Sequence, residues 1–155
     1  MPPSPSDSVA LWLTDRLLSE SLSDADALVL ERLDAEVGRG TSLDEQLRAF
    51  TKSRPEAPGE FGLEHAVVWL LPFMVSAVKK FMDGFLKKVG EKTAEMSVDA
   101  VKDRVRTSLT TDRDTFALLE ASFTERAAAM NIPRATYAAY LEELRRHPEM
   151  LLSDR

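Results

Sequence analysis

Regularly spaced carboxylates are the first residues of the sequence whose types could support chemistry. Glu91, Glu95, Asp99 and Asp103 recur every four residues, so a helix would align them along one face. Paired carboxylates of this kind can transfer protons or bind a metal ion. No histidine accompanies them at the spacing of bundle metal sites, and the chain contains no cysteine. We therefore expect a solvated acidic stripe, and a protein without catalytic residues, cofactor or metal.

Lysines gather in the most apolar part of the chain. Six of the seven lysines lie between Lys79 and Lys102, whereas the rest of the chain uses mainly arginine. Apolar residues around them recur every three or four positions, as on one face of a helix. These residues are Val75, Val78, Met82, Phe85 and Val89. The lysines are therefore expected to form either a solvated edge of a buried helix or a surface that meets an anionic partner or a membrane.

Residues 63–89 form the segment around which the chain is organised. Its apolar run from Ala66 to Val78 would extend about 20 Å as a helix, whereas the hydrocarbon core of a membrane is about 30 Å thick. The run is thus too short for a typical membrane span, and three interpretations stay open: a core helix, a self-association or partner surface, and an interfacial membrane helix. The predicted partner or membrane surface consists of Trp69, Phe73, Val78, Lys79, Lys80, Phe81, Phe85, Lys87 and Lys88.

The C-terminal residues 124–146 contain two amphipathic segments joined by a short turn. Ala127 is a small residue where the two segments would cross, Asn131 occupies the turn, and Tyr137 falls at a position that would be buried. With this spacing the stretch resembles a helix-turn-helix motif. The resemblance implies that residues 134–146 would enter a DNA groove. The implied contact residues are Arg134, Thr136, Arg145 and Arg146.

Charge makes nucleic acid an electrostatically weak partner for this segment. Glu142 and Glu143 lie on the implied DNA-reading helix, while phosphate contacts supply most nonspecific affinity for DNA. The net charge of the whole chain is −6, so a general basic footprint is missing. A structural helical hairpin or a protein-binding helical unit is the alternative interpretation of the same pattern.

The periodicity of the chain predicts an all-α fold. We expect a compact bundle of six or seven helices around a long central helix, at about residues 63–90, kinked near Pro72. The other helices are predicted at 7–20, 24–37, 43–53, 92–109, 112–130 and 134–147. Ser6 or Asp7 is expected to cap the first of them, and Thr111 the helix that begins at 112.

The 155 residues are most simply organised as one domain. We expect a disordered leader at 1–6 and a helical domain at 7–155. An alternative organisation has a three-helix N-terminal subdomain at 7–53, a linker at 54–62 and a C-terminal helical part at 63–155. The lack of cysteine fits a reducing cytoplasm, and the use of Ala, Arg, Asp and Val is typical of a high-GC bacterium.

These observations lead to one principal prediction and two alternatives. The protein is expected to be a non-enzymatic helical interaction module that forms a homo-oligomer or binds a protein partner through residues 63–89. Its lysines would attract an acidic surface, such as the acidic N-terminal half of another copy. The first alternative is a DNA-binding regulator that uses residues 124–146. The second is a membrane-associating protein that uses the basic amphipathic residues 66–89.

Overall fold

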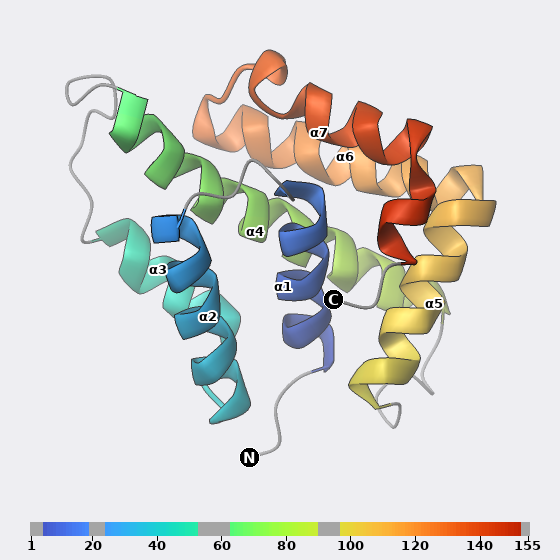
Figure 1. Cartoon of the computed structure of the whole chain (residues 1–155), viewed down its shortest axis with the longest axis horizontal. Coiled ribbons are helices and arrows are strands. Elements are labelled where there is room, and N and C mark those ends of the chain that lie inside the picture. Colours follow the sequence, from blue (N-terminus) through green and yellow to red (C-terminus); the bar gives the residue numbers. More distant parts are fainter. Residues whose placement is uncertain (1–4, 19–23, 53–62, 90–96, 153–155) are drawn as a thin grey trace.

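The computed structural model describes residues 5–18, 24–52, 63–89 and 97–152, and every regular element in these ranges is a helix (Figure 1). Side chains are described in the same ranges except at residues 49–52 and 63–69. The helices are α1 (Pro5–Leu18), α2 (Asp24–Gly38), α3 (Leu43–Lys52), α4 (Leu63–Val89), α5 (Val98–Thr111), α6 (Arg113–Met130), α7 (Arg134–Arg146) and a short 3-10 helix, η4 (Pro148–Leu151). The predicted all-α bundle around a long central helix is confirmed.

Helix α4 is the centre of the bundle and crosses the molecule in Figure 1. It packs most extensively against α6 and α1, and it also contacts α3. Phe73 of α4 meets Phe123 of α6 edge to face, with ring centroids 5.8 Å apart, and lies 5.6 Å from the ring of Tyr137 in α7. These aromatic contacts join three helices. They are favourable because each ring buries a large apolar area and aromatic rings prefer such tilted pairings.

The central helix continues through Pro72 without interruption. Proline lacks a backbone N–H, and a kink near Pro72 was predicted, which a continuous helix can accommodate. Pro72 is buried, as are most of the residues that follow it up to Phe85. Tertiary packing on several sides therefore holds the helix together across a residue that weakens its backbone hydrogen bonding.

Helix ends follow local rules in most places. The Ser42 hydroxyl accepts the backbone N–H of Glu45 at 3.4 Å at the start of α3. Asn131 ends α6 in the left-handed conformation, with φ of 57°, and its N–H donates to the Ala127 carbonyl. The cap of α6 is Asp112 rather than the predicted Thr111, since the Asp112 carboxylate accepts the N–H of Asp114 at 3.0 Å.

Asp7 departs from its predicted role. Helix α1 begins at Pro5, inside the predicted leader, so Asp7 lies within its first turn rather than capping it. The Asp7 carboxylate instead accepts the backbone N–H of Leu43 at 3.1 Å, at the start of α3. A helix leaves its first N–H groups without intrahelical partners, and a carboxylate from a neighbouring helix satisfies one of them here. Asp7 thus joins α1 to α3.

Candidate functional site

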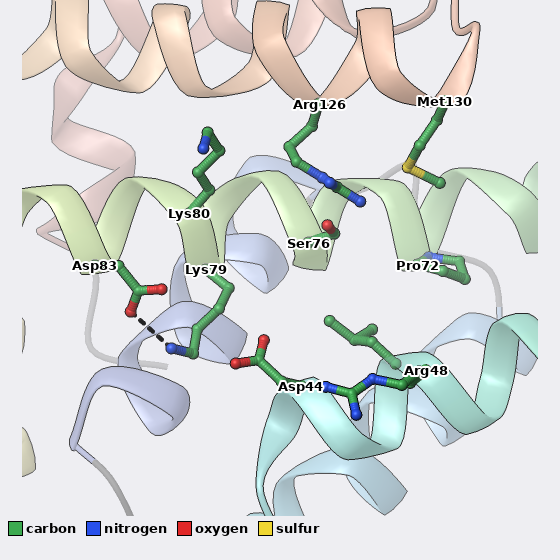
Figure 2. Close-up of a pocket in the computed structure, with 10 residues that line it drawn as sticks. Asp44, Arg48, Pro72, Ser76, Lys79, Lys80, Asp83, Arg126 and Met130 are labelled. Carbon is green, nitrogen blue, oxygen red and sulfur yellow. Dashed lines mark hydrogen bonds and ion pairs between the residues drawn. The ribbon is translucent and has the colours of Figure 1, made fainter.

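A groove lies where α3, α4 and α6 meet, and it encloses a cavity of about 530 Å³ (Figure 2). Its charged and polar lining residues are Asp44, Arg48, Ser76, Lys79, Lys80, Asp83 and Arg126. Its apolar lining residues are Leu47, Pro72 and Met130. Four cations face two carboxylates, which leaves the groove with a balance of +2.

The central helix supplies one wall of the groove through its polar edge. Lys79 and Lys80 lie three and four residues after Ser76, and Asp83 lies four and three residues after them, so the four residues share one side of α4. The opposite side carries Phe81 and Phe85, which pack into the core. The groove is therefore the place where the otherwise buried middle of α4 presents polar groups to solvent.

At one end of the groove, Lys79 is held by carboxylates. Its ammonium nitrogen lies 2.7 Å from Asp83 Oδ1 and 3.4 Å from Asp7 Oδ1, and its side chain is only 13% exposed. Figure 2 shows the Asp44 carboxylate turned toward the same ammonium group. Burial lowers the pKa of Lys79, but the hydrogen bond and charge of Asp83, together with the charges of Asp7 and Asp44, outweigh it and raise this pKa. Lys79 is therefore a charged, internally neutralised part of the fold.

At the other end, two arginines line the groove from opposite walls. Arg126 of α6 extends over Ser76, and Arg48 lies on α3 (Figure 2). Within the described ranges, neither guanidinium makes an ion pair, and the buried Nε of Arg126 has no hydrogen-bond partner. A buried donor without an acceptor costs about 1–3 kcal/mol. An acceptor that enters the groove would remove this cost.

Lys80 is intermediate between the fully paired Lys79 and the two arginines, because it makes one weak ion pair. Its ammonium nitrogen lies 3.5 Å from Glu125 Oε1 of α6, and both side chains are largely exposed. An exposed pair of this kind contributes little to stability, about 0–1 kcal/mol. Lys80 can therefore exchange Glu125 for a competing anion at small cost.

The chemistry of the lining defines the kind of group that fits. A guanidinium presents a planar fork of donors that matches a carboxylate. The apolar side chains of Leu47, Pro72 and Met130 lie beside the two arginines. The groove thus suits a carboxylate carried next to an apolar side chain.

No known protein family, curated protein or solved structure matches the chain. The function is therefore argued from the geometry of the groove.

The predicted partner surface is divided by the fold. Phe73, Val78, Phe81 and Phe85 are 0–2% exposed within the single chain, so they pack the core of the bundle. Lys79 and Lys80 line the groove, whereas Lys87 and Lys88 are exposed in the last turn of α4. The side chain of Trp69 lies outside the described residues. Among the described members of this set, only the lysines are therefore accessible to a partner while the bundle stays closed.

The helix-turn-helix resemblance involves α6 and α7, which approach each other near the turn and again toward their far ends. Near the turn, the rings of Phe123 and Tyr137 lie 5.6 Å apart. Toward the far end, Phe116 lines the same small cavity as Leu141 and Arg145. Helices of a DNA-binding helix-turn-helix cross at about 90–120°. Contacts that continue along both helices are instead typical of a helical hairpin.

The four implied DNA-contacting residues, Arg134, Thr136, Arg145 and Arg146, are all exposed. Arg145 donates hydrogen bonds to the carboxylate of Glu142, one turn earlier in α7. This contact lowers the pKa of Glu142 and raises that of Arg145. One of the four predicted contacts is thus neutralised within its own helix.

The acidic stripe is only partly visible. Asp99 and Asp103 are exposed on α5, and Asp103 pairs with Arg106 at 2.8 Å, while Glu91 and Glu95 lie outside the described residues. Across the part of the chain that the structure describes, no group of three or more histidines or carboxylates is arranged to hold a metal ion. In the same part, no helix has the length and hydropathy to cross a membrane.

Sequence patterns contained a signal for only one wall of the groove. The polar positions of α4 at spacings of three and four would have identified Ser76 and Asp83 along with the lysines. Asp44 and Arg48 belong to α3 and Arg126 to α6, and nothing in their local sequence marks them. Their proximity arises only when α3 and α6 pack on the two sides of α4.

Proposed function

We propose that this protein is a non-enzymatic interaction module that binds an acidic segment of a protein partner in the groove between α3, α4 and α6. The proposal rests on Arg48 and Arg126, which lack ion-pair partners among the described residues. They lie beside the apolar floor of the groove, which consists of Leu47, Pro72 and Met130. Such a surface gains both electrostatic and apolar contacts from a segment in which a carboxylate neighbours an apolar side chain.

The fold supports partner binding at the groove rather than at the aromatic face of α4. That face is already covered by α1 and α6, and exposing it would require the bundle to open. The groove needs no such change, because its lining is accessible in the closed bundle. A volume of about 530 Å³ lies within the range of about 300–1,000 Å³ that ligand pockets occupy.

The groove also favours binding over catalysis. Its described hydroxyl, Ser76, lies beneath the guanidinium of Arg126 in Figure 2, and a cation does not activate a hydroxyl as a general base would. The Asp83 carboxylate is engaged by Lys79. These residues attract and orient a charged group, which is the task of a recognition site.

The test is an NMR titration of isotopically labelled protein with an acetylated, amidated tetrapeptide of two leucines between two glutamates. We expect shift changes confined to the groove. Replacement of both glutamates by glutamine, or of Arg126 by Gln in the protein, should weaken binding at least tenfold, because hydrogen bonds between charged groups contribute about 1.5–3 kcal/mol. Lys88→Gln is the matched control, since Lys88 is exposed on α4 but does not line the groove. Equal binding of the glutamine peptide, or no binding of either peptide, would overturn the proposal.

A further inference from the structure

The groove fits a segment in which carboxylates flank an apolar side chain, and helix α2 of this chain contains such a segment. Leu28 is 66% exposed, and among the described residues the other large apolar side chain so exposed is Leu152, which follows η4. Exposed apolar side chains are common singly. Leu28 is informative because of what surrounds it.

Leu28 occupies the middle of the solvent-facing side of α2. The buried side of this helix is formed by Leu30, Leu33 and Val37. Successive residues of a helix are rotated by about 100°, which places Leu28 nearly opposite that stripe. Asp24 lies one turn before Leu28 and Glu31 about one turn after it, and both are exposed. An apolar side chain therefore stands between two carboxylates on one accessible face.

The charges of the two surfaces are complementary. Helix α2 carries five carboxylates and one arginine, a balance of −4, while the cations of the groove that make no ion pair among the described residues are Arg48 and Arg126. Complementary charge steers association and fixes the orientation of the two surfaces. Leu28 is left in water and the Nε of Arg126 has no acceptor among the described residues, and a single contact between two copies can satisfy both.

We infer that the partner segment is α2 of a second copy of this chain, with Leu28 placed on the apolar floor of the groove and with Asp24 and Glu31 bound by Arg126 and Arg48. The inference rests on the proposed function, for which it names the partner. The contact joins two different surfaces, so it either is made twice within a closed dimer or repeats into a ring or a longer assembly.

The first experiment is light scattering of the full chain from micromolar to millimolar concentration. We expect a mass above that of one chain, which falls with dilution and with added salt. Leu28→Asp removes the apolar contact and Arg126→Glu repels the carboxylates of α2, so each variant alone is expected to be monomeric. Leu152→Asp is the matched control, because it makes the same change at another exposed leucine, and it should assemble like the unmodified chain.

The decisive step is to mix the two variants. The Leu28→Asp chain keeps an intact groove and the Arg126→Glu chain keeps an intact α2 face, so an equimolar mixture should form a complex of two chains although each variant alone does not. Circular dichroism of both variants verifies that they remain folded. A monomeric unmodified chain at every concentration, variants that assemble normally, or a mixture that stays monomeric would each overturn the inference.

The tetrapeptide titration separates this inference from the proposed function. The monomeric Leu28→Asp chain still presents Arg48 and Arg126, so it should bind the glutamate peptide with unchanged affinity. Peptide binding without association of copies would overturn only the choice of partner. Loss of both peptide binding and association of copies would overturn the groove as a recognition site.

Discussion

The two ends of the groove hold cations in opposite states. Lys79 is surrounded by Asp7, Asp44 and Asp83, and its charge is neutralised within the chain. Arg126, on the facing helix, lines the same groove, and its buried Nε has no acceptor in the part of the chain that the structure describes. The difference separates two uses of charge: the paired cation holds helices together, and the unpaired cation is available to a partner. Substitutions at the two ends should therefore affect different properties.

The largest effect is expected from Asp7→Ala. The change removes the acceptor for the Leu43 N–H and one carboxylate of Lys79. We expect the free energy of unfolding to fall by about 3 kcal/mol, since an N-cap contributes about 0.5–2 kcal/mol and the loss of one partner of a buried ion pair costs up to about 3–5 kcal/mol. Urea denaturation measures this fall in the free energy of unfolding. Asp7→Asn keeps an acceptor for Leu43 and should lose less, and equal stability of all three proteins would contradict a structural role for this end.

Arg126→Gln should show the converse pattern. Because the Arg126 guanidinium makes no ion pair within the described ranges, its loss should change the free energy of unfolding by less than about 1 kcal/mol. Binding of the glutamate tetrapeptide should nevertheless weaken at least tenfold. Urea denaturation and the NMR titration together test the prediction. A large loss of stability in this variant would mean that both ends of the groove are structural.

The comparison also predicts a dependence on pH for the end of the groove that Lys79 occupies. The pKa of Lys79 is raised above its ordinary value of 10.5 in the folded chain. The stability that it contributes is therefore fully present below about pH 10.5 and is lost as the pH rises through the folded pKa. We expect Lys79→Met to be less stable than the unmodified chain at pH 8, and the gap between them to narrow above pH 10.5. A gap that stays constant up to pH 11.5 would contradict the assignment.

The smallest effect is expected at α7. If α6 and α7 act as a helical hairpin, double-stranded DNA should bind only weakly, and Arg134→Ala with Arg146→Ala should reduce this binding without any sequence preference. Fluorescence anisotropy with a labelled duplex at low and physiological salt is the measurement. Arg145→Ala should change little, because Glu142 already holds that guanidinium. Tight, sequence-dependent DNA binding would favour the DNA-binding regulator over a module that binds an acidic segment in the groove.

Much of the fold could be predicted because it depends on local periodicity. Stripes such as Val101, Val105 and Leu109 identify helices and their buried faces directly. The same patterns cannot say what covers a face. Phe73 and Phe81 were predicted to belong to a partner surface, and the structure covers them with helices of the same chain, because apolar periodicity is identical for a core and for an interface. Where a function depends on that distinction, packing has to be known.

The groove and the Asp7 contact could not be predicted for a related reason. The local sequence favours Asp7 as the cap of its own helix. In the structure, its carboxylate instead accepts the backbone N–H of Leu43, which belongs to another helix. Arg48, Ser76 and Arg126 come from three helices, and their proximity depends on how these helices pack rather than on any spacing. Pro148, directly after the last predicted helix, begins η4, which is consistent with the tolerance of proline in a first helical turn.

The packing of α1 has a consequence for the order in which the protein acquires its structure. The apolar stripe of α1, with Val9 and Leu13 at 0% exposure, belongs to a helix that packs most extensively against α4 and to a smaller extent against α2 and α5. Helix α4 is synthesised after α2 and α3, at roughly 5–20 residues per second. During that interval the stripe lacks the largest of the surfaces that cover it in the folded chain. Once residues 63–89 have left the ribosome, α1 can dock on α4, which brings Asp7 to Lys79.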